Sequence, residues 1–332
     1  MKPKVYITYP VTKQVEDFIA EHCTIRKWEG DGRIPKDVLL KEIADVEGLY
    51  TSGSMAGNID EKFLNHASNL KVISNVSVGY NNFDVEAMNK HNVIGTNTPY
   101  VLDETVADLA FGLILSTARR IVELDRFVKE GNWKSTTHYG ELYGKDVHSA
   151  TLGIIGMGRI GEAIARRAKF GFNMDVLYHN RNRKLEAEEK YGAEYCELKS
   201  LLMRSDYVLL MTPLSPETFQ LMGKEEFKLM KKSAIFINVS RGQTVDERAL
   251  IHALESEEIY GAGLDVYEKE PVEVENPLLG MRNVVTVPHI GSATAKTEAA
   301  MAMRAAENLV AVLTGKEPMD PVGLSEIEGK SL

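Results

Sequence analysis

The 332-residue sequence has little cysteine and no long apolar run. Its two cysteines, Cys23 and Cys196, form no CxxC motif and no Cys/His pair, which argues against a disulfide framework or a zinc site. Apolar runs such as "YVLLM" are far shorter than the ~20 residues of a membrane span. The opening "MKPKVYITYP" has no signal-peptide core. We therefore expect a cytoplasmic protein without a bound metal and without a membrane segment.

Positive charge is not in excess either. Lys and Arg number 39 against 48 Asp and Glu, and the net charge of −9 disfavours a general role on nucleic acid or on a membrane surface. A small anionic substrate remains compatible with this charge if a cation is supplied locally. The composition, 44% hydrophobic and 26% charged, is that of a globular protein, and the length predicts two domains.

The sequence does contain a regular alternation of apolar runs and amphipathic segments. Continuous apolar strands separated by helices indicate parallel sheets that are buried on both faces. The expected fold class is therefore α/β, with two doubly wound, Rossmann-like domains and an interdomain cleft, which is a common place for a ligand. The expected strands lie at 5–10, 46–52, 70–79, 150–158, 173–179, 205–212, 233–240 and 259–267.

Two helices mark the crossings between the domains. Residues 100–130 read as one long helix with Asp103 as its N-cap, and 293–314 read as a final helix. A single C-terminal helix cannot fold alone, so it must return to an earlier unit. We predict a substrate domain from residues 1–99 plus 288–332 and an NADP-binding domain from 100–287. Residues 322–332 are expected to form a loose tail.

The stretch "LGIIGMGRIG" contains a glycine-rich turn, Gly156-x-Gly158-x-x-Gly161, between an apolar strand and an amphipathic helix. In this context the pattern is typical of dinucleotide binding. Gly156 permits the tight turn, Gly158 lets the backbone approach a pyrophosphate, and Gly161 lets the helix pack close to the strand. The helix N-terminus offers free N–H groups to the anion. A structural strand–turn–helix without a cofactor is the alternative.

The second strand after this turn ends in "LYHNRNRK", where many dinucleotide-binding proteins carry an acidic residue. Asn180 removes the carboxylate that would repel a 2′-phosphate, and Arg181 and Arg183 offer charge-assisted hydrogen bonds to it. The pattern predicts a preference for NADP(H) over NAD(H). A solvated basic patch on a loop is the competing interpretation.

Three later segments each place one charged residue at a strand end: Arg241 in "NVSRGQ", Glu270 in "DVYEKEP" and His289 in "VPHIGS". Reduction of a 2-oxo acid needs a cation for the carboxylate and carbonyl, a proton donor, and a group that keeps the donor protonated. Arg241, His289 and Glu270 can supply these in turn. Each residue alone is usually a surface or structural group, so the hypothesis depends on their combination with the glycine turn.

Several segments together resemble the D-isomer-specific 2-hydroxyacid dehydrogenase family over nearly the whole chain. The resemblance is greatest to the branch of glyoxylate/hydroxypyruvate reductases and 2-ketogluconate reductases, and it implies NADPH-dependent reduction of 2-oxo acids to D-2-hydroxy acids. The matching segments are "NVSVGYNNFDVEA" (75–87), "GTNTPYVLDETVADLAFGLIL" (95–115), "GIIGMGRIG" (153–161), "NVSRGQTVDERAL" (238–250), "AGLDVYEKEP" (262–271) and "PHIGSAT" (288–294).

The resemblance also implies a role for each matched position. Arg241 would bind the substrate carboxylate and polarise the 2-oxo group, His289 would donate a proton, and Glu270 would keep His289 charged. Backbone N–H groups of Val78 and Gly79 would hold the substrate carboxylate. The implied cofactor contacts are Thr105, Gly156, Gly158, Arg159, Ile160, Gly161, Asn180, Arg181, Arg183, Thr212, Pro213, Val239, Ser240, Arg241, Asp265, His289 and Gly291.

The chain departs from relatives at two places. NAD-specific relatives carry Asp at the position of Asn180. The loop "STTHYGELYG" (135–144) lacks the Trp that some reductases carry there, which argues against a specificity restricted to two- or three-carbon substrates. His138, Tyr139, Glu141 and Tyr143 would suit substrate hydroxyls, so 2-ketogluconate is expected as a substrate beside glyoxylate and hydroxypyruvate. Alternatively, these side chains only face solvent.

Members of the resembled family pair through the region 100–130, and its apolar residues spread around the helix. We therefore expect a homodimer. Two other functions remain open: a nucleotide-sensing binding protein or corepressor on the same scaffold, and an NAD-linked D-2-hydroxyacid dehydrogenase. Turnover with glyoxylate would distinguish an enzyme from a binding protein.

Overall fold

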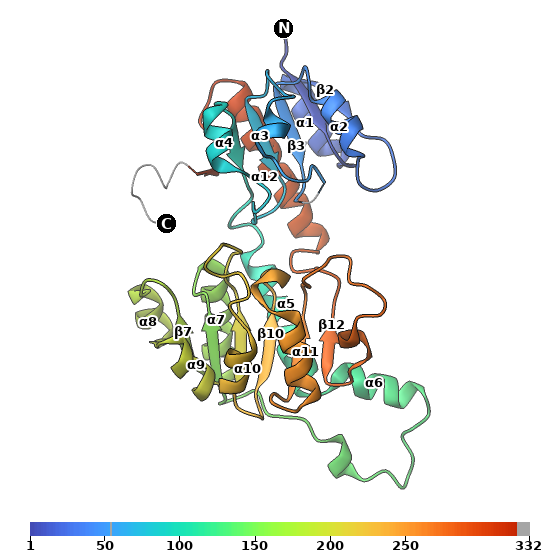
Figure 1. The fold of residues 1–332 in the computed structure, drawn as a ribbon, viewed down its shortest axis with the longest axis vertical. Helices are drawn as coiled ribbons and strands as arrows, with labels where there is room; N and C mark the ends of the chain where they lie inside the picture. The colour runs from blue at the N-terminus through green and yellow to red at the C-terminus, as the bar shows by residue number, and fades with distance from the viewer. Residues whose placement is uncertain (54, 324–332) are drawn as a thin grey trace. The chain divides into compact units, whose positions relative to one another are not determined.

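The computed structural model describes residues 1–53 and 55–323, and its chain divides into two compact units (Figure 1). The first unit comprises Met1–Leu102 and the chain from Thr294 onward, and the second comprises Asp103–Ala293. The unit boundaries lie three and six residues beyond those expected from the sequence. The second shift has a clear cause. The backbone N–H of His289 donates to the carbonyl of Asp265 (2.9 Å), which keeps the segment after residue 287 with the second unit.

The first unit is built on a six-stranded sheet in the order β13-β5-β4-β3-β1-β2. All neighbours are parallel except β13, which runs antiparallel to β5. Every residue of β3 and β4 is buried, as expected of strands covered on both faces. The strands are β1 (Lys4–Ile7), β2 (Thr24–Lys27), β3 (Gly48–Thr51), β4 (Val72–Asn75), β5 (Ile94–Thr96) and β13 (Pro321–Val322).

The C-terminal helix α12 (Ala295–Leu313) returns to this first sheet. The Ser74 hydroxyl donates to the carbonyl of Ala305 (2.6 Å), and the Tyr50 hydroxyl donates to that of Ala302 (2.8 Å). The other helices of the unit are α1 (Lys13–His22), α2 (Lys36–Glu42), α3 (Glu61–Leu64) and α4 (Val85–Lys90). Val322 lies in β13 rather than in a loose tail, and the rest of that expected tail, from residue 324, lies outside the described residues.

The second unit carries a seven-stranded, all-parallel sheet in the order β12-β11-β10-β9-β6-β7-β8. Its inner strands end side by side, because Leu210 pairs with Ile155 and with Asn238, and Leu264 pairs with Asn238 and with Thr286. Loops that follow these strands therefore meet at one edge. The strands are β6 (Thr151–Ile155), β7 (Asp175–His179), β8 (Glu194–Tyr195), β9 (Tyr207–Leu210), β10 (Ile235–Asn238), β11 (Gly261–Leu264) and β12 (Val284–Thr286).

Helices cover both faces of this second sheet (Figure 1). On one face, Leu201, Phe227 and Leu250 from three helices pack into a core with Val208 and Phe236 of the strands. On the other face, a Cβ added at Gly263 would come within 3.0 Å of Leu113 on α5. The helices are α5 (Asp103–Ala118), α6 (Ile121–Lys129), α7 (Arg159–Phe172), α8 (Leu185–Tyr191), α9 (Leu198–Arg204), α10 (Lys224–Leu229) and α11 (Glu247–Glu255), with short 3₁₀ turns η1 (Tyr139–Leu142), η2 (Gly242–Thr244) and η3 (Pro277–Gly280).

The single helix expected over 100–130 is wrong, because the structure divides it into α5 and α6. Arg120 separates them in the left-handed conformation (φ 55°). Its guanidinium pairs with Glu123 (2.8 Å) and also donates to the carbonyls of Glu141 (2.7 Å) and Tyr143 (3.2 Å). These contacts tie the break to the loop before β6, a tertiary effect that helical periodicity does not reveal. In the described part of the chain, no helix is both long and apolar enough to cross a membrane.

Candidate active site

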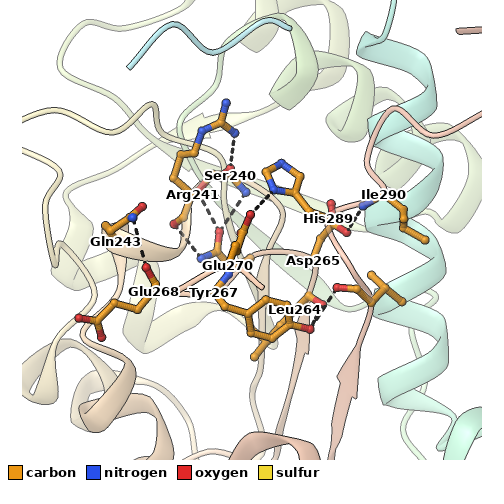
Figure 2. Close-up of polar contacts among 12 residues, drawn as sticks. Ser240, Arg241, Gln243, Leu264, Asp265, Tyr267, Glu268, Glu270, His289 and Ile290 are labelled. Carbon is orange, nitrogen blue, oxygen red and sulfur yellow. Dashed lines mark hydrogen bonds and ion pairs between the residues drawn. The ribbon is translucent and has the colours of Figure 1, made fainter. Parts of the chain in front are cut away.

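The three charged residues singled out in the sequence follow three neighbouring strands. Arg241 comes three residues after β10, Glu270 lies in the loop after β11, and His289 comes three residues after β12. Because these strands are parallel and end in register, all three residues lie at one edge of the sheet. Figure 2 shows the Glu270 carboxylate pointing at the His289 ring, with Arg241 on the adjacent loop.

His289 and Glu270 form a direct ion pair. The Nδ1 atom of His289 lies 2.7 Å from Oε2 of Glu270, and Oε1 accepts the backbone N–H of Tyr267 (3.1 Å). Burial raises the pKa of Glu270, but the hydrogen bond and positive charge of His289 outweigh it, so this pKa lies below its ordinary value. An ionised carboxylate needs a proton on Nδ1, which leaves Nε2 as the nitrogen available for proton transfer.

Asp265 supports the loop that carries His289. Its carbonyl accepts the His289 N–H, and its carboxylate Oδ1 accepts the Ile290 N–H (2.6 Å). His289 has φ 51°, a left-handed conformation that costs a non-glycine residue roughly 1–2 kcal/mol. Asp265 is only 1% exposed; burial raises its pKa, while the Ile290 N–H and the charge of His289 lower it. The family resemblance implies that Asp265 contacts the cofactor. In the structure its carboxylate accepts the N–H of Ile290, the residue after His289.

Arg241 lies on a loop that packs closely against the loop of Glu270. A Cβ added at Gly242 would come within 1.8 Å of the Tyr267 carbonyl oxygen, so only glycine permits this approach. The guanidinium donates to the Ser240 carbonyl (2.7 Å), and the Arg241 carbonyl accepts the Thr244 hydroxyl (2.5 Å). Burial lowers the pKa of Arg241 and the charge of Glu270 raises it; an arginine remains charged under both influences.

The glycine turn has the geometry that a dinucleotide requires. Gly156 has φ 105°, and a Cβ there would lie 2.7 Å from the Met211 carbonyl. Gly158 caps α7 without a side-chain hydrogen bond, and a Cβ there would meet nothing within 4 Å. Next to the turn, the buried hydroxyl of Thr212 has no hydrogen-bond partner among the described residues. Open space at a helix N-terminus and an unpaired buried hydroxyl both fit a nicotinamide dinucleotide.

Asn180 contacts the glycine turn directly. Its Oδ1 accepts the Met157 N–H (2.6 Å), and its Nδ2 donates to the Met157 carbonyl (3.1 Å). Only an amide can make both bonds, because a carboxylate has no proton to donate. The sequence shows that position 180 lacks an acidic side chain. It does not show this contact, because Asn180 and Met157 lie 23 residues apart along the chain.

The two arginines after β7 differ in their surroundings. Arg183 pairs with Glu188 through two hydrogen bonds (2.5 and 3.0 Å), and Glu188 also accepts the Tyr178 hydroxyl (2.6 Å). Arg181 is exposed and makes no hydrogen bond or ion pair within the described ranges. Of the two, Arg181 is therefore the arginine without a hydrogen-bonded partner among the described residues, although its positive charge helps to lower the pKa of Glu217.

The remaining implied cofactor contacts of the second unit lie along the same edge. Arg159, at the start of α7, pairs with Asp103 (3.2 Å) at the start of α5. Burial raises the pKa of Asp103, and Arg159 opposes that effect. Other implied contacts lie on the first turns of α5 and α7 and after β9, β10 and β12: Thr105, Ile160, Gly161, Pro213, Val239, Ser240 and Gly291.

Val78 and Gly79 belong to the first unit, in the loop after β4. The Val78 carbonyl accepts a hydrogen bond from the Asn97 amide (2.8 Å), and the Gly79 carbonyl accepts one from the Ser77 hydroxyl (2.5 Å). Across the described residues, the N–H groups of Val78 and Gly79 have no acceptor. Both are available to an anion.

Comparison with known proteins identifies the relatives of the chain. Residues 111–291 match the family model described as D-isomer specific 2-hydroxyacid dehydrogenase, NAD binding domain. The chain is 46% identical over 315 residues to glyoxylate/hydroxypyruvate reductase B of Serratia proteamaculans (95% of this chain, 96% of the relative). It is 48% identical over 317 residues to the protein of that name from Escherichia coli O17:K52:H18, with the same coverage.

Two crystal structures illustrate the shared fold. A protein of Thermus thermophilus is 39% identical, with a TM-score of 0.87 over 96% of this chain and 99% of that one. The NADPH-dependent glyoxylate/hydroxypyruvate reductase of Sinorhizobium meliloti, in complex with NADP and malonate, is 31% identical. Its TM-score is 0.86, with 97% of each chain covered.

Proposed function

The chain belongs to the D-isomer-specific 2-hydroxyacid dehydrogenase family, and from this premise we propose that it reduces 2-oxo acids to D-2-hydroxy acids with NADPH. The observation that carries the proposal is the His289–Glu270 ion pair, which lies beside Arg241 on the sheet edge that also bears the glycine turn. The names of the relatives support glyoxylate and hydroxypyruvate as substrates.

Each of the three charged residues has a defined task in this mechanism. When bound, the nicotinamide supplies the hydride for the 2-oxo carbon. Arg241 holds the substrate carboxylate and polarises the carbonyl. His289 gives the proton on Nε2 to the carbonyl oxygen as it becomes a hydroxyl, and Glu270 stabilises the protonated imidazole. The 2-oxo acid thereby gains one hydride and one proton, and solvent returns the proton to His289.

The cofactor proposal depends on the loop after β7. NADP(H) is preferred over NAD(H) because Arg181 is free to pair with the 2′-phosphate, and the neutral Asn180 does not repel it. The N-terminus of α7 at Gly158 would receive the pyrophosphate, and the Thr212 hydroxyl would find a partner on the cofactor. The S. meliloti relative, which is described as NADPH-dependent, supports this assignment.

The loop 135–144 extends the proposal to longer substrates. Tyr139, the first residue of η1, and Tyr143, which directly follows it, are each 71% exposed, and Glu141 is exposed as well. Their hydroxyl and carboxylate groups suit a polyhydroxylated chain better than an apolar wall would. We therefore include 2-ketogluconate among the substrates.

The proposed enzyme is a homodimer. Helix α6 buries none of its residues, and Ile121, Val122 and Val128 are about half exposed on it, with Trp133 60% exposed just beyond. Such an apolar surface is typical of an interface. Light scattering at micromolar concentration should give about 74 kDa, twice the 37.0 kDa of the chain. A 37.0 kDa particle would contradict the dimer.

The proposed activity is tested with a panel of 2-oxo acids. Purified protein is assayed with glyoxylate, hydroxypyruvate and 2-ketogluconate, each with NADPH and with NADH. We expect turnover of all three and a higher kcat/KM with NADPH. Tight NADPH binding without any turnover would favour the nucleotide-sensing protein instead, and equal efficiency with NADH would favour the NAD-linked dehydrogenase.

A further inference from the structure

Two segments of the first unit face each other where the strands β4 and β5 end. The carbonyl of Ser77 accepts the Thr98 N–H (3.0 Å), and the carbonyl of Val78 accepts the Asn97 side-chain amide (2.8 Å). Two successive carbonyls of one loop are therefore both directed at the segment 97–98. Successive carbonyls of an extended chain alternate in direction, so this loop departs from an extended conformation here.

The orientation of the carbonyls fixes the orientation of the N–H groups. A trans peptide unit is planar, and its N–H points opposite to its C=O. The Ser77 carbonyl shares its unit with the Val78 N–H, and the Val78 carbonyl shares its unit with the Gly79 N–H. Both N–H groups therefore point away from the segment 97–98, toward the same side. Neighbouring N–H groups that converge in this way make an anion-binding concavity.

We propose that Asn97 is a positioning residue for the substrate carboxylate: by holding the Val78 carbonyl, it aims the Gly79 N–H at the anion. The inference rests on the proposed function and on the carboxylate-binding role that the family resemblance implies for the Val78 and Gly79 amides. Asn97 itself makes no contact with the substrate. Its role is to prevent the Val78–Gly79 peptide unit from rotating.

Asn97 is itself anchored by the C-terminal part of the unit. Its N–H donates to the Asp320 carbonyl (3.3 Å), and its carbonyl accepts the Asn308 amide (3.3 Å). The Asn308 amide also donates to the Asp320 carboxylate (2.9 Å), which pairs with Arg304 (2.6 Å). Asn97 is 8% exposed and Asp320 is 5% exposed. The carboxylate loop is thus held by a network that ends on α12 and on the segment before β13.

An amide is the side chain that this position needs. It donates a hydrogen bond to the carbonyl without bringing a charge near the anion. Aspartate has nearly the same shape, but its ionised carboxylate would face the Val78 carbonyl oxygen and repel it. The Asn97→Asp variant therefore removes the positioning contact with little change in volume, and Asn97→Ala removes it without adding charge.

The test compares substrates with and without a carboxylate. We measure kcat and KM with NADPH for glyoxylate and for methylglyoxal, an uncharged carbonyl compound, in wild type, Asn97→Asp and Asn97→Ala. We expect the KM for glyoxylate to rise about tenfold, the effect of one lost buried hydrogen bond, while kcat/KM for methylglyoxal and the Kd for NADPH stay unchanged. The matched control is Asn82→Ala, since its amide donates to the carbonyl of Gly57 (3.2 Å) and not to the loop.

The outcomes separate this inference from the proposed function. If wild type reduces no 2-oxo acid, the proposed function fails. If wild type is active and both Asn97 variants keep the wild-type ratio of kcat/KM for glyoxylate to kcat/KM for methylglyoxal, the positioning role is wrong. An equal decrease in kcat/KM for both substrates would also overturn the positioning role, because it would indicate general damage to the protein. Should one variant fail to fold, the other decides the question; should both fail, Asn97 supports the fold and the positioning role is rejected.

Discussion

The two sheets of this protein share one architecture and present different chemistry at their carboxyl edges. In the first sheet β1 lies between β2 and β3, and in the second β6 lies between β7 and β9. At the first edge, the ends of β4 and β5 and the loops after them bring uncharged groups together, among them Asn75, Asn97 and the Val78–Gly79 amides. The second edge carries Arg241, Glu270 and His289. The doubly wound fold supplies an edge, and the loops determine what that edge can bind.

The difference has an energetic basis. A buried amide needs only hydrogen-bond partners, so Asn97 can be 8% exposed while its side-chain amide donates to the Val78 carbonyl. A buried charge needs an opposite charge or water. The side chains of His289 and Glu270 pair with each other and stay 46% and 36% exposed. The edge with His289 and Glu270 is thus suited to proton transfer, and the uncharged amides after β4 and β5 are suited to holding an anion in place.

The largest expected effect comes from removing the proton donor at the charged edge. His289→Ala should lower kcat for glyoxylate by about 10²–10⁴-fold, because general acid catalysis contributes about that much. The Kd for NADPH should stay close to wild type. The matched control is His252→Ala, a histidine of α11 in the same unit that lies away from the sheet edge. A His289→Ala variant with near-normal kcat would show that the charged edge does not carry the chemistry.

A smaller effect is expected when the charge of Glu270, which pairs with His289, is removed. In Glu270→Gln, the protonated imidazole loses its stabilising carboxylate. The alkaline limb of the pH profile for reduction should then move to lower pH. Glu273→Gln is the control, because Glu273 pairs with Lys269 at an exposed site. An unchanged profile in Glu270→Gln would rule out the assigned role.

The same pair also has an expected effect at acid pH. The pKa of Glu270 is lowered in the folded state, so the pair stabilises the fold above the ordinary pKa of a glutamate. This contribution is lost as the pH falls through the lower folded-state value. Wild type should therefore lose more stability than Glu270→Gln on acidification, as measured by urea unfolding at several pH values. Parallel curves for the two proteins would contradict the pairing.

The two arginines after β7 are expected to differ in their effect on cofactor binding. Arg181→Ala should raise the KM for NADPH about tenfold to a hundredfold, the value of one charge-assisted hydrogen bond, and leave NADH nearly unchanged. Arg183→Ala should have a much smaller effect, because Arg183 is already paired with Glu188. A specific contact of Arg181 with the 2′-phosphate would be excluded if Arg181→Ala raised the KM for NADPH and for NADH equally. It would also be excluded if Arg183→Ala raised the KM for NADPH as much as Arg181→Ala does.

The smallest effect is expected in the loop 135–144. Glu141→Ala should lower kcat/KM for 2-ketogluconate about threefold to tenfold, as for one lost hydrogen bond, and leave glyoxylate unaffected. The carbonyl of Glu141 is held by Arg120 and is not altered by this change. If wild type does not turn over 2-ketogluconate, the absence of Trp from the loop does not widen the substrate range.

Most strands and helices, and the charged residues of the candidate site, could be predicted from the amino-acid sequence. Apolar runs and their spacing indicated two parallel-sheet units, and the return of α12 followed from the fact that one helix cannot fold alone. The family was identified from short motifs, and the family model and the relatives confirm it. These features are local, because periodicity and glycine spacing are properties of neighbouring residues.

Which polar groups contact one another could not be predicted from the sequence, because it depends on the folded structure. The break at Arg120 depends on carbonyls about twenty residues away, and the pairing of Arg183 with Glu188 left Arg181 as the free arginine. The contacts of Asn180 with Met157 and of Asn97 with Val78 join separate segments of the chain. A hydrogen bond depends on distance and angle between atoms, and those are set by the packing of strands and helices that no sequence pattern encodes.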